Sequence, residues 1–304
     1  MLPVTRILCA TDFSDVSTKA EAYAVAMARR HGARLRLLHV APPLPLVAQY
    51  GELPLDVRML DEQRLDTERA MRAARARAQA AGVPTDADLL DGAPVGEILD
   101  ASRSADLVVL GTHGRGGFDR LMLGSVAEKV LRNARCAVMV VPAASTPEHG
   151  VCFAKVLCPT DGSAQSPAAI DAAVTLVPET EGTLHLLEVV EPMPVVTEFD
   201  AVQGAAYATE AEALAHSRLH AAVSADVRRR CRVVEDVSRG KASDRILATA
   251  QATAADLIVM GVRDRSALDL FAFGSTANEV VRRAGCPVLV VHPPRDRAAD
   301  MAWD

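Results

Sequence analysis

Arg6 to Ser14 reads RILCATDFS, and Lys155 to Ser163 reads KVLCPTDGS. Their cysteine, threonine and aspartate residues align, and Asp161 follows Asp12 by 149 residues. Each segment is a short apolar run that ends in Thr-Asp, and we predict a buried strand in each. The repeat indicates that the chain contains two copies of one structural unit.

Two further pairs of segments extend the repeat toward the end of each copy. DLVVLG (Asp106 to Gly111) matches DLIVMG (Asp256 to Gly261), and CAVMVVP (Cys136 to Pro142) matches CPVLVVH (Cys286 to His292). The offset is now 150 residues, so one residue was gained between the segments. A chain of 304 residues also has the length expected for two domains.

The boundary between the copies has its own composition. Pro142 to Ala154 (PAASTPEHGVCFA) mixes Pro, Ser, Gly and His without periodicity, so we place the interdomain linker there. The predicted domains are residues 1–146 and 154–294. Within the first domain, Gly32 and Gly82 follow helical patterns and predict left-handed caps at two helix ends.

Short apolar runs alternate with longer helical patterns in each half. This alternation is typical of βαβ units and a parallel sheet, which places the chain in the α/β class. The composition agrees, because 50% of residues are apolar and only 3% are aromatic, as expected for aliphatic helices packed on a parallel sheet. The strands predicted in the first half are Arg6 to Ala10, Arg34 to Val40, Asp86 to Leu90, Leu107 to Leu110 and Ala137 to Val141.

Charge and composition argue against several classes of partner. A formal net charge of -6 is unfavourable for binding nucleic acid, which needs concentrated Lys and Arg. The sequence shows neither a secretion signal nor an apolar stretch long enough for a membrane span, so we expect no membrane partner. The six cysteines have no paired C-x-x-C spacing, and we expect a reduced, cytoplasmic setting in which they are small core residues.

A glycine-containing loop follows the fourth strand of the first half. GTHGRGGFDRLMLGSVAEKVL places Gly111, Gly114 and Gly124-Ser125 in the pattern G-x2-G-x9-G-S. The loop begins at the carboxyl end of a predicted parallel strand and ends where a helix begins, which is where such sheets bind ligands.

Each residue type in this loop has a physical reason to bind phosphate. Gly111 and Gly114 allow tight turns and leave room for phosphate oxygens to approach backbone amides. Gly124 and Ser125 open a helix whose unpaired N–H groups suit an anion. Arg115 and His113 are the nearby candidates for neutralising outer phosphates.

Asp12 ends the first strand and faces the same edge if the sheet is doubly wound. It is a candidate ligand for ribose or for a metal-linked water, and the sequence leaves both open. The alternative is a turn or helix-cap carboxylate, and the recurrence of the residue as Asp161 favours the ligand contact over it.

Taken together, these segments resemble the universal stress protein (UspA-like) family in a tandem form. The resemblance covers Arg6 to Pro293 and rests on the ATDFS and PTDGS strand ends, the LLHV and LLEVV second strands, the glycine loop and the VVP ending. It implies two tandem Rossmann-like domains of the adenine nucleotide α-hydrolase-like type, each with a five-stranded parallel sheet and helices on both faces. It also implies pairing through the last strands, within the chain and in a homodimer, and ATP or AMP binding as in some members.

The resemblance assigns site residues position by position. The adenine and ribose contacts would be Thr11, Asp12 and Val40, with Leu110 beside the base. The phosphate contacts would be Gly111, Gly114, Arg115, Gly124, Ser125 and Val126. The cofactor expected from these residues is ATP, or AMP or ADP, with Mg²⁺ accompanying the nucleotide and no separate metal site.

The second half departs from this pattern at one position. Where the first half has Gly114, the second has Asp264, whose carboxylate beside a phosphate would cost on the order of a few kcal/mol unless Arg263 or Arg265 screens it. We therefore predict a weaker or absent second nucleotide site. Its residues would be Thr160, Asp161, Val189, Gly261, Gly274, Ser275 and Thr276.

No catalytic motif accompanies the loop. The sequence contains no SGG-x-DS phosphate loop, HIGH-like histidine pair, Ser-His-Asp order or HExxH pair. The leading hypothesis is a regulatory stress-response protein that binds ATP mainly in its first domain, with any hydrolysis slow. The alternatives are a slow metal-dependent ATPase or nucleotidyl transferase that uses Asp12, and a nucleotide-free dimeric scaffold.

Overall fold

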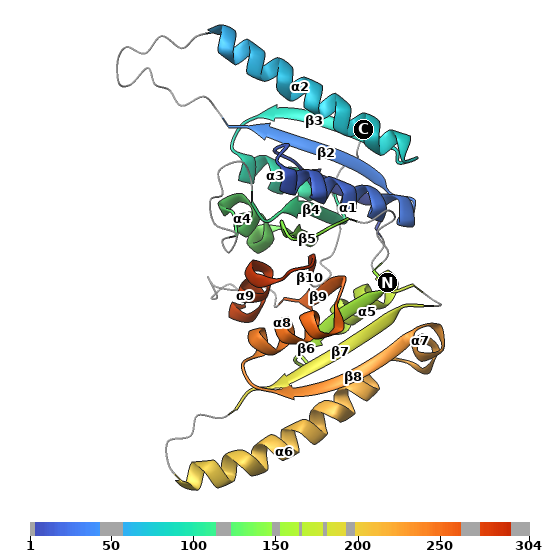
Figure 1. Ribbon diagram of the computed structural model, residues 1–304, viewed down its shortest axis with the longest axis vertical. Coiled ribbons are helices and arrows are strands. Elements are labelled where there is room, and N and C mark those ends of the chain that lie inside the picture. The colour runs from blue at the N-terminus through green and yellow to red at the C-terminus, as the bar shows by residue number, and fades with distance from the viewer. Residues whose placement is uncertain are drawn as a thin grey trace.

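A computed structural model shows a long molecule with two similar halves, one above the other in Figure 1. It describes residues 4–42, 57–113, 123–147, 153–163, 166–178, 181–192, 198–262 and 274–292. Strands and helices alternate along almost the whole of this part of the chain, as the sequence predicts.

Ten strands form the centre of the described structure. They are Arg6–Ala10 (β1), Arg34–Ala41 (β2), Thr85–Asp91 (β3), Leu107–Gly111 (β4), Ala137–Val141 (β5), Lys155–Thr160 (β6), Thr183–Val190 (β7), Arg232–Arg239 (β8), Leu257–Gly261 (β9) and Val288–Val291 (β10). The helices are Asp15–His31 (α1), Val57–Ala80 (α2), Pro94–Ser102 (α3), Ser125–Asn133 (α4), Ser166–Leu176 (α5), Glu198–Ala221 (α6), Ala225–Arg230 (α7), Ala242–Thr253 (α8) and Ser275–Arg283 (α9).

Each half contains a five-stranded parallel sheet. The order is β3-β2-β1-β4-β5 in the first half and β10-β9-β6-β7-β8 in the second, and every neighbouring pair within a half is parallel. The order changes direction at β1 and at β6, so the carboxyl end of each of these strands lies at a switch point. The predicted α/β fold is confirmed, and the five predicted strands of the first half differ by no more than one residue at either end.

The two halves join through their last strands. β5 and β10 pair antiparallel, with Val288 opposite Val140 and Val290 opposite Val138, so that one ten-stranded sheet runs through the chain. On one side of this junction α4 and α9 lie close together (Figure 1), and Arg282 donates a hydrogen bond to Glu128 at 3.3 Å. The strand that the resemblance assigns to dimer formation is therefore already paired within the chain.

Helices cover both faces of the sheet, and each face has its own apolar core. One core contains residues of α1, α2, α5 and α6, and the other contains residues of α3, α4, α8 and α9. Alternate residues of one strand contribute to opposite cores, as Ile7 and Cys9 face the first and Leu8 faces the second. Because each core spans both halves, apolar burial as well as strand pairing holds the halves together.

The predicted glycine caps are present at the ends of α1 and α2. Gly32 has φ 63° and its N–H donates to Ala28, while Gly82 has φ 80° in the turn that follows α2. Only glycine adopts this left-handed conformation at little cost, so these two positions end their helices sharply.

The five described cysteines are free thiols. Cys9 and Cys158 are fully buried, and burial raises the pKa of both, to about 12 for Cys158. Both therefore act as small core residues rather than nucleophiles. No helix among the described residues is long and apolar enough to span a membrane.

Candidate functional site

The site predicted in the first half lies at the carboxyl edge of its sheet. Parallel pairing of β1 with β2 and with β4 brings the ends of these three strands to one edge. That edge holds Thr11, Asp12, Val40, Leu110 and Gly111. Val40 and Leu110, two of the predicted adenine and ribose contacts, belong to the same apolar core, and Val126, a predicted phosphate contact, packs on it.

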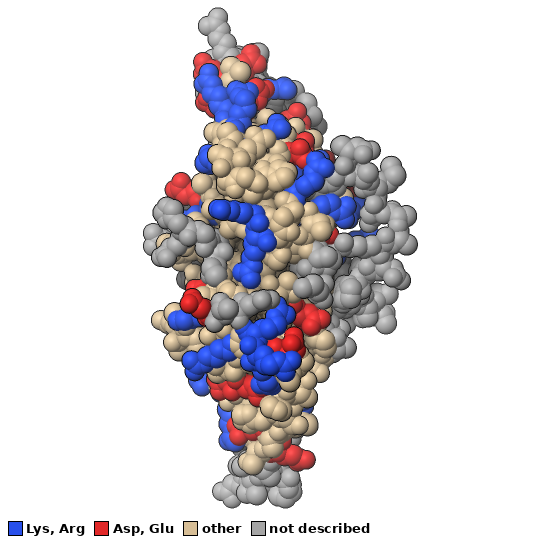
Figure 2. All heavy atoms as spheres, turned by 90° about the vertical axis from the view of Figure 1, so that its right-hand side faces the viewer, with Lys and Arg blue, Asp and Glu red and all other residues tan. Residues whose placement is uncertain are grey.

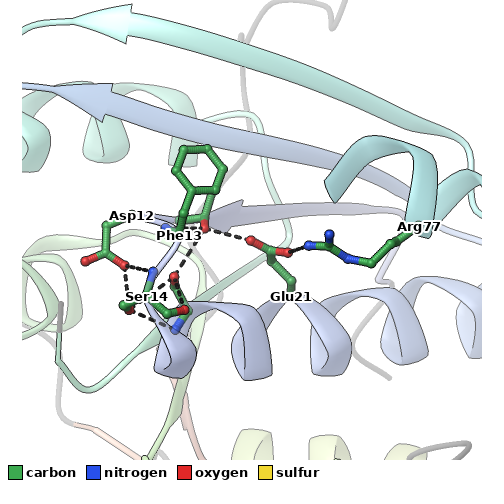
Figure 3. Close-up of polar contacts among 7 residues, drawn as sticks. Asp12, Phe13, Ser14, Glu21 and Arg77 are labelled. Atoms are coloured by element: carbon green, nitrogen blue, oxygen red, sulfur yellow. Dashed lines mark hydrogen bonds and ion pairs between the residues drawn. The ribbon is translucent and has the colours of Figure 1, made fainter. Parts of the chain in front are cut away.

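Asp12 belongs to a tight turn between β1 and α1. Its Oδ1 accepts hydrogen bonds from the Ser14 backbone N–H at 3.1 Å and from the Ser14 hydroxyl at 2.7 Å (Figure 3). The Ser14 Oγ in turn accepts from the Ser17 N–H at 3.2 Å and caps α1. The turn-carboxylate alternative for Asp12 therefore describes its observed contacts, and a ligand contact would add to them.

Thr11 connects this turn to a buried carboxylate. The Thr11 side chain accepts a hydrogen bond from the Phe13 N–H at 3.1 Å, and its hydroxyl donates to Glu21 Oε1 at 2.7 Å. Glu21 also accepts from Arg77 of α2 at 2.8 Å, so it lies between the turn and that helix (Figure 3). The residue exposure of Glu21 is only 5%, so these two donors satisfy a carboxylate that is almost out of reach of solvent.

Phe13 adopts an unusual backbone conformation in the same turn. Its φ of 61° is in the left-handed region, which bulky side chains rarely adopt. Its ring stacks on His39 with centroids 4.8 Å apart and 30° between the planes. The His39 Nδ1 lies 2.8 Å from the Thr11 carbonyl oxygen, which can only accept, so Nδ1 carries the proton.

Two predicted glycines have neighbours that explain why a side chain does not fit. A Cβ on Gly111 would lie 2.9 Å from Val16 Cγ1, and a Cβ on Gly124 would lie 3.0 Å from the Thr112 carbonyl oxygen. Gly111 ends a strand without a positive φ. The tight-turn explanation for Gly111 is therefore wrong, since the close approach of α1 excludes a side chain there.

The amino end of α4 differs from that of α1. Its N-cap is Gly124, which has no side chain to accept from the first turn, whereas Ser14 caps α1. The Gly124 N–H donates to the Thr112 carbonyl at 2.7 Å, which fixes the start of the helix beside β4. The first amides of α4, beginning at the exposed Ser125, therefore have no capping side chain from their N-cap residue, and such amides suit an anion.

His113 follows Thr112 directly at this edge. Its Nδ1 lies 2.9 Å from the Thr112 hydroxyl, while its Nε2 is buried with no hydrogen-bond partner among the described atoms. A buried imidazole nitrogen is normally hydrogen-bonded. Gly114 and Arg115 lie outside the described residues.

Comparison with known proteins follows this geometry. The model of the universal stress protein family matches the chain twice, over residues 3–142 and 153–292. The chain belongs to the universal stress protein family. Each matched range contains one of the two five-stranded units, so this is a tandem form of the family.

Some related universal stress proteins match most of this chain, and others match about half of it. One from Mycobacterium tuberculosis is 30% identical over 263 residues, which is 82% of this chain and 81% of the relative. One from Thermus aquaticus is 42% identical over 141 residues, covering 44% of this chain and 96% of the relative. The crystal structure of a universal stress protein from Archaeoglobus fulgidus, 24% identical, matches with a TM-score of 0.69 over 96% of this chain and 97% of that one, which shows the same fold.

The second universal stress protein domain repeats the turn with different side chains. Asp161 Oδ1 accepts from the Ser163 N–H at 2.9 Å, and the Thr160 hydroxyl oxygen accepts from the Gly162 N–H at 3.2 Å. Gly162 has φ 67°, so the residue after Thr-Asp is left-handed in this turn as it is in the first. Here the position is occupied by glycine, and the side chain of Arg218 lies 2.9 Å from where a Cβ would be.

The remaining residues predicted for the second site lie at the matching edge. They are Val189 near the end of β7, Gly261 at the end of β9, and Gly274, Ser275 and Thr276 at the start of α9. Gly274 is also an N-cap without a side-chain acceptor, but a Cβ there would meet no atom within 4 Å. Arg263, Asp264 and Arg265 lie outside the described residues.

The sequence did not reveal Glu21, Arg77, Phe13 or His39 as parts of the first site. For Glu21 the signal was available, because it stands on the same helical face as the apolar residues Ala24 and Ala28. A carboxylate within a buried helical stripe needs a donor nearby. The long distance along the chain to Arg77 explains why that partner was not identified.

Proposed function

We propose that this universal stress protein binds an adenine nucleotide, ATP or else AMP or ADP, at the carboxyl edge of its first domain. The observation that supports this most directly is the start of α4, where the N-cap is a glycine, which has no side chain to accept from the first amides. This helix end stands beside the Asp12 turn, because Gly111 contacts α1 and Gly124 is bonded to Thr112. Together these features form a site of the kind that holds phosphate groups.

The residues divide naturally by chemistry in this proposal. The backbone of Gly124, Ser125 and Val126 would donate to phosphate oxygens, with Gly114 and Arg115 completing the loop. Asp12 would accept from ribose hydroxyls, and Thr11, Val40 and Leu110 would lie near the base. A Mg²⁺ ion arriving with the nucleotide would neutralise part of the phosphate charge. No group of three or more His, Cys, Asp and Glu side chains within the described ranges is arranged to hold a metal ion.

Basic side chains are also present on the opposite side of the molecule. Figure 2 shows clusters of Lys and Arg on the side away from the carboxyl ends of β2 and β8. Salt screens such charges over about 8 Å at physiological ionic strength. The proposal therefore depends on the backbone donors at the carboxyl edge and not on these clusters.

We propose that the first domain holds most of the nucleotide. The sequence of the second loop has Asp264 where the first has Gly114, and Val262 replaces Thr112. The second loop therefore has a carboxylate at a position where the first has only backbone. This change disfavours a phosphate chain.

The proposed biological role is regulatory, in the stress response and in the cytoplasm. Bound nucleotide would report or buffer nucleotide state, with hydrolysis slow at most. A slow ATPase and a nucleotide-free scaffold are the alternatives. Mass spectrometry of small molecules released from the purified protein separates the scaffold from the other two, and turnover of an Asp12→Asn variant separates the ATPase from the regulator. A homodimer would have to use a surface other than β5 and β10.

A matched pair of substitutions tests the nucleotide site. Ser125→Asp and Ser275→Asp each add a carboxylate at the exposed first residue of α4 or α9, where an acidic residue is compatible with the helix. In calorimetric titration of the full chain, the dissociation constant for Mg-ATP should rise about tenfold or more in Ser125→Asp and should be unchanged in Ser275→Asp. The reverse order would contradict a first-domain site, and absence of binding by the wild-type chain would remove the proposal.

A further inference from the structure

We infer that Glu21 is a positioning residue for the nucleotide site of the first domain. By fixing the Thr11 hydroxyl as an acceptor for the Phe13 N–H, it holds the Asp12–Phe13 turn in its left-handed shape. This inference rests on the proposed function, because Asp12 is the ribose contact proposed there. Glu21 itself lies below the turn in α1 and is not a contact of the nucleotide.

The direction of each hydrogen bond carries the argument. A threonine hydroxyl has one proton, and Glu21 Oε1 at 2.7 Å takes it because a carboxylate can only accept. The Thr11 oxygen is then left with lone pairs, one of which meets the Phe13 N–H at 3.1 Å. Glu21 therefore removes the rotational freedom of this hydroxyl and aims its acceptor at the turn.

Arg77 holds the second oxygen of the Glu21 carboxylate. Glu21 is 5% exposed, and the Arg77 guanidinium donates to its Oε2 at 2.8 Å from the surface of α2. The other oxygen, Oε1, accepts from Thr11. The two bonds together fix the orientation of the carboxylate, and with it the direction in which the Thr11 hydroxyl donates.

The second domain has no carboxylate at the position of Glu21, and its turn has a glycine in place of Phe13. At the position of Glu21 it has Ile170, and at the position of Phe13 it has Gly162. Both equivalences follow from the same offset of 149 in residue number. The backbone shape is the same, since φ is 61° at Phe13 and 67° at Gly162. Glycine adopts that conformation freely, whereas phenylalanine must be held there. The buried carboxylate at this position is thus present in the domain whose turn contains the strained phenylalanine and absent from the domain whose turn contains glycine.

The turn is mechanically connected to the rest of the site. Asp12 precedes Phe13 and bonds Ser14, and the first turn of α1 contacts Gly111 through Val16. If Phe13 relaxed to an ordinary conformation, Asp12 would move relative to Gly111 and to the start of α4. Loss of Glu21 should therefore weaken nucleotide binding although Glu21 touches no nucleotide.

Three variants of the full chain test the inference by calorimetric titration with Mg-ATP. Glu21→Ile copies the second domain, and Glu21→Gln keeps the volume while removing the charge. We expect about tenfold weaker binding for Glu21→Ile and a smaller loss for Glu21→Gln, in line with losing one well-placed hydrogen bond. The double variant Glu21→Ile/Phe13→Gly should recover affinity to within about threefold of wild type, because the strained residue is gone.

The rescue separates positioning from general destabilisation. If Glu21→Ile only weakened the fold, Phe13→Gly would not restore ATP affinity, and that result would overturn the inference. Unchanged affinity in Glu21→Ile and Glu21→Gln would overturn it as well. Arg72→Gln is the control, because Arg72 is another α2 arginine paired to a carboxylate, but the side chain of its partner Glu68 is 35% exposed compared with 7% for Glu21, and none of the contacts described for Glu68 reaches the turn. It should bind ATP like the wild type.

A readout without nucleotide distinguishes failure of the support that Glu21 gives to the turn from failure of the proposed function. Amide hydrogen exchange of the segment from Thr11 to Ser14 should be faster in Glu21→Gln than in the wild type and slow again in the double variant. If the wild-type chain binds no ATP, the proposed function fails and this measurement alone decides the positioning role. Equal exchange in all variants would then refute it.

Discussion

The β1–α1 turn of the first domain and the β6–α5 turn of the second have the same shape and different supports. Both have a left-handed residue after Thr-Asp, with φ 61° in one and 67° in the other. In the first domain the arginine of the last turn of α2, Arg77, pairs with Glu21 of α1. In the second domain the arginine of the last turn of α6, Arg218, pairs with Glu188 of β7.

The comparison teaches that the repeat conserves backbone geometry while exchanging the carboxylate that supports it. Glu188 stands where the first domain has His39, and Ile170 stands where it has Glu21. Arg218 also fills the space beside Gly162, on the same side as the Phe13 ring that stacks on His39 in the first domain. A change in one side chain of the turn is therefore matched by changes in the residues around it.

Removing Arg218 should have the largest effect on stability. Arg218→Met leaves Glu188, which is 4% exposed, without its charged donor, and the free energy of unfolding should fall by about 2–3 kcal/mol. Urea unfolding of the full chain measures this. Adding Glu188→Leu to Arg218→Met should recover most of the loss, because no buried charge then remains. A double variant as unstable as the single one would show that Arg218 acts through packing alone.

Removing Arg77 should cost less. In Arg77→Met, Glu21 keeps the Thr11 hydroxyl as a donor, and the side chain of Arg77 is 58% exposed compared with 39% for Arg218. We expect a loss of about 1–2 kcal/mol in the same assay. If Arg77→Met were more damaging than Arg218→Met, the ranking of the two ion pairs by burial would be wrong.

Gly162→Ala tests the glycine of the second turn. An alanine at φ 67° is strained, and its Cβ would displace the Arg218 side chain from 2.9 Å, so we expect a loss of about 1 kcal/mol. Gly96→Ala is the matched control, since Gly96 lies in α3 with no atom within 4 Å of an added Cβ. There the same change should be stabilising. Equal effects of the two changes in thermal unfolding would argue against strain at Gly162.

The smallest effect is a pH dependence at α9. Lys241, Ser243 and Arg283 lower the pKa of Glu279 to about 2, and the equivalent residue in the first domain is Lys129. A lowered pKa stabilises the fold above the unfolded value near 4.5, and this contribution disappears as the pH falls toward 2. The melting temperature of Glu279→Gln should therefore lie below that of the wild type at pH 6 and approach it in acid. A constant difference would contradict this assignment.

Most of the fold follows from the sequence, because its signals are local and occur twice. The apolar runs, the caps at Gly32 and Gly82 and the internal repeat each determine structure within a few residues. The antiparallel pairing of β5 with β10 was expected only from the family resemblance, since no local pattern specifies which strand edges meet.

The candidate site was predicted less completely. Residue type and position next to a strand end or a helix start are enough to suggest Asp12, Gly124 and Ser125 as candidates. The reason for Gly111 was wrong because a sequence does not show that α1 approaches within contact distance. Glu21 and Glu188 were missed because each is one charged residue in an apolar stretch, and its arginine partner lies on a different element, far away along the chain.

The junction of β5 with β10 affects how the two sites can diverge in evolution. Two separate copies of one domain would receive every substitution twice, so both sites would have to remain identical. Here the partners are parts of one polypeptide, and a substitution at Phe13 leaves Gly162 untouched. Covalent fusion therefore frees one domain to specialise while the other keeps the shared sheet intact.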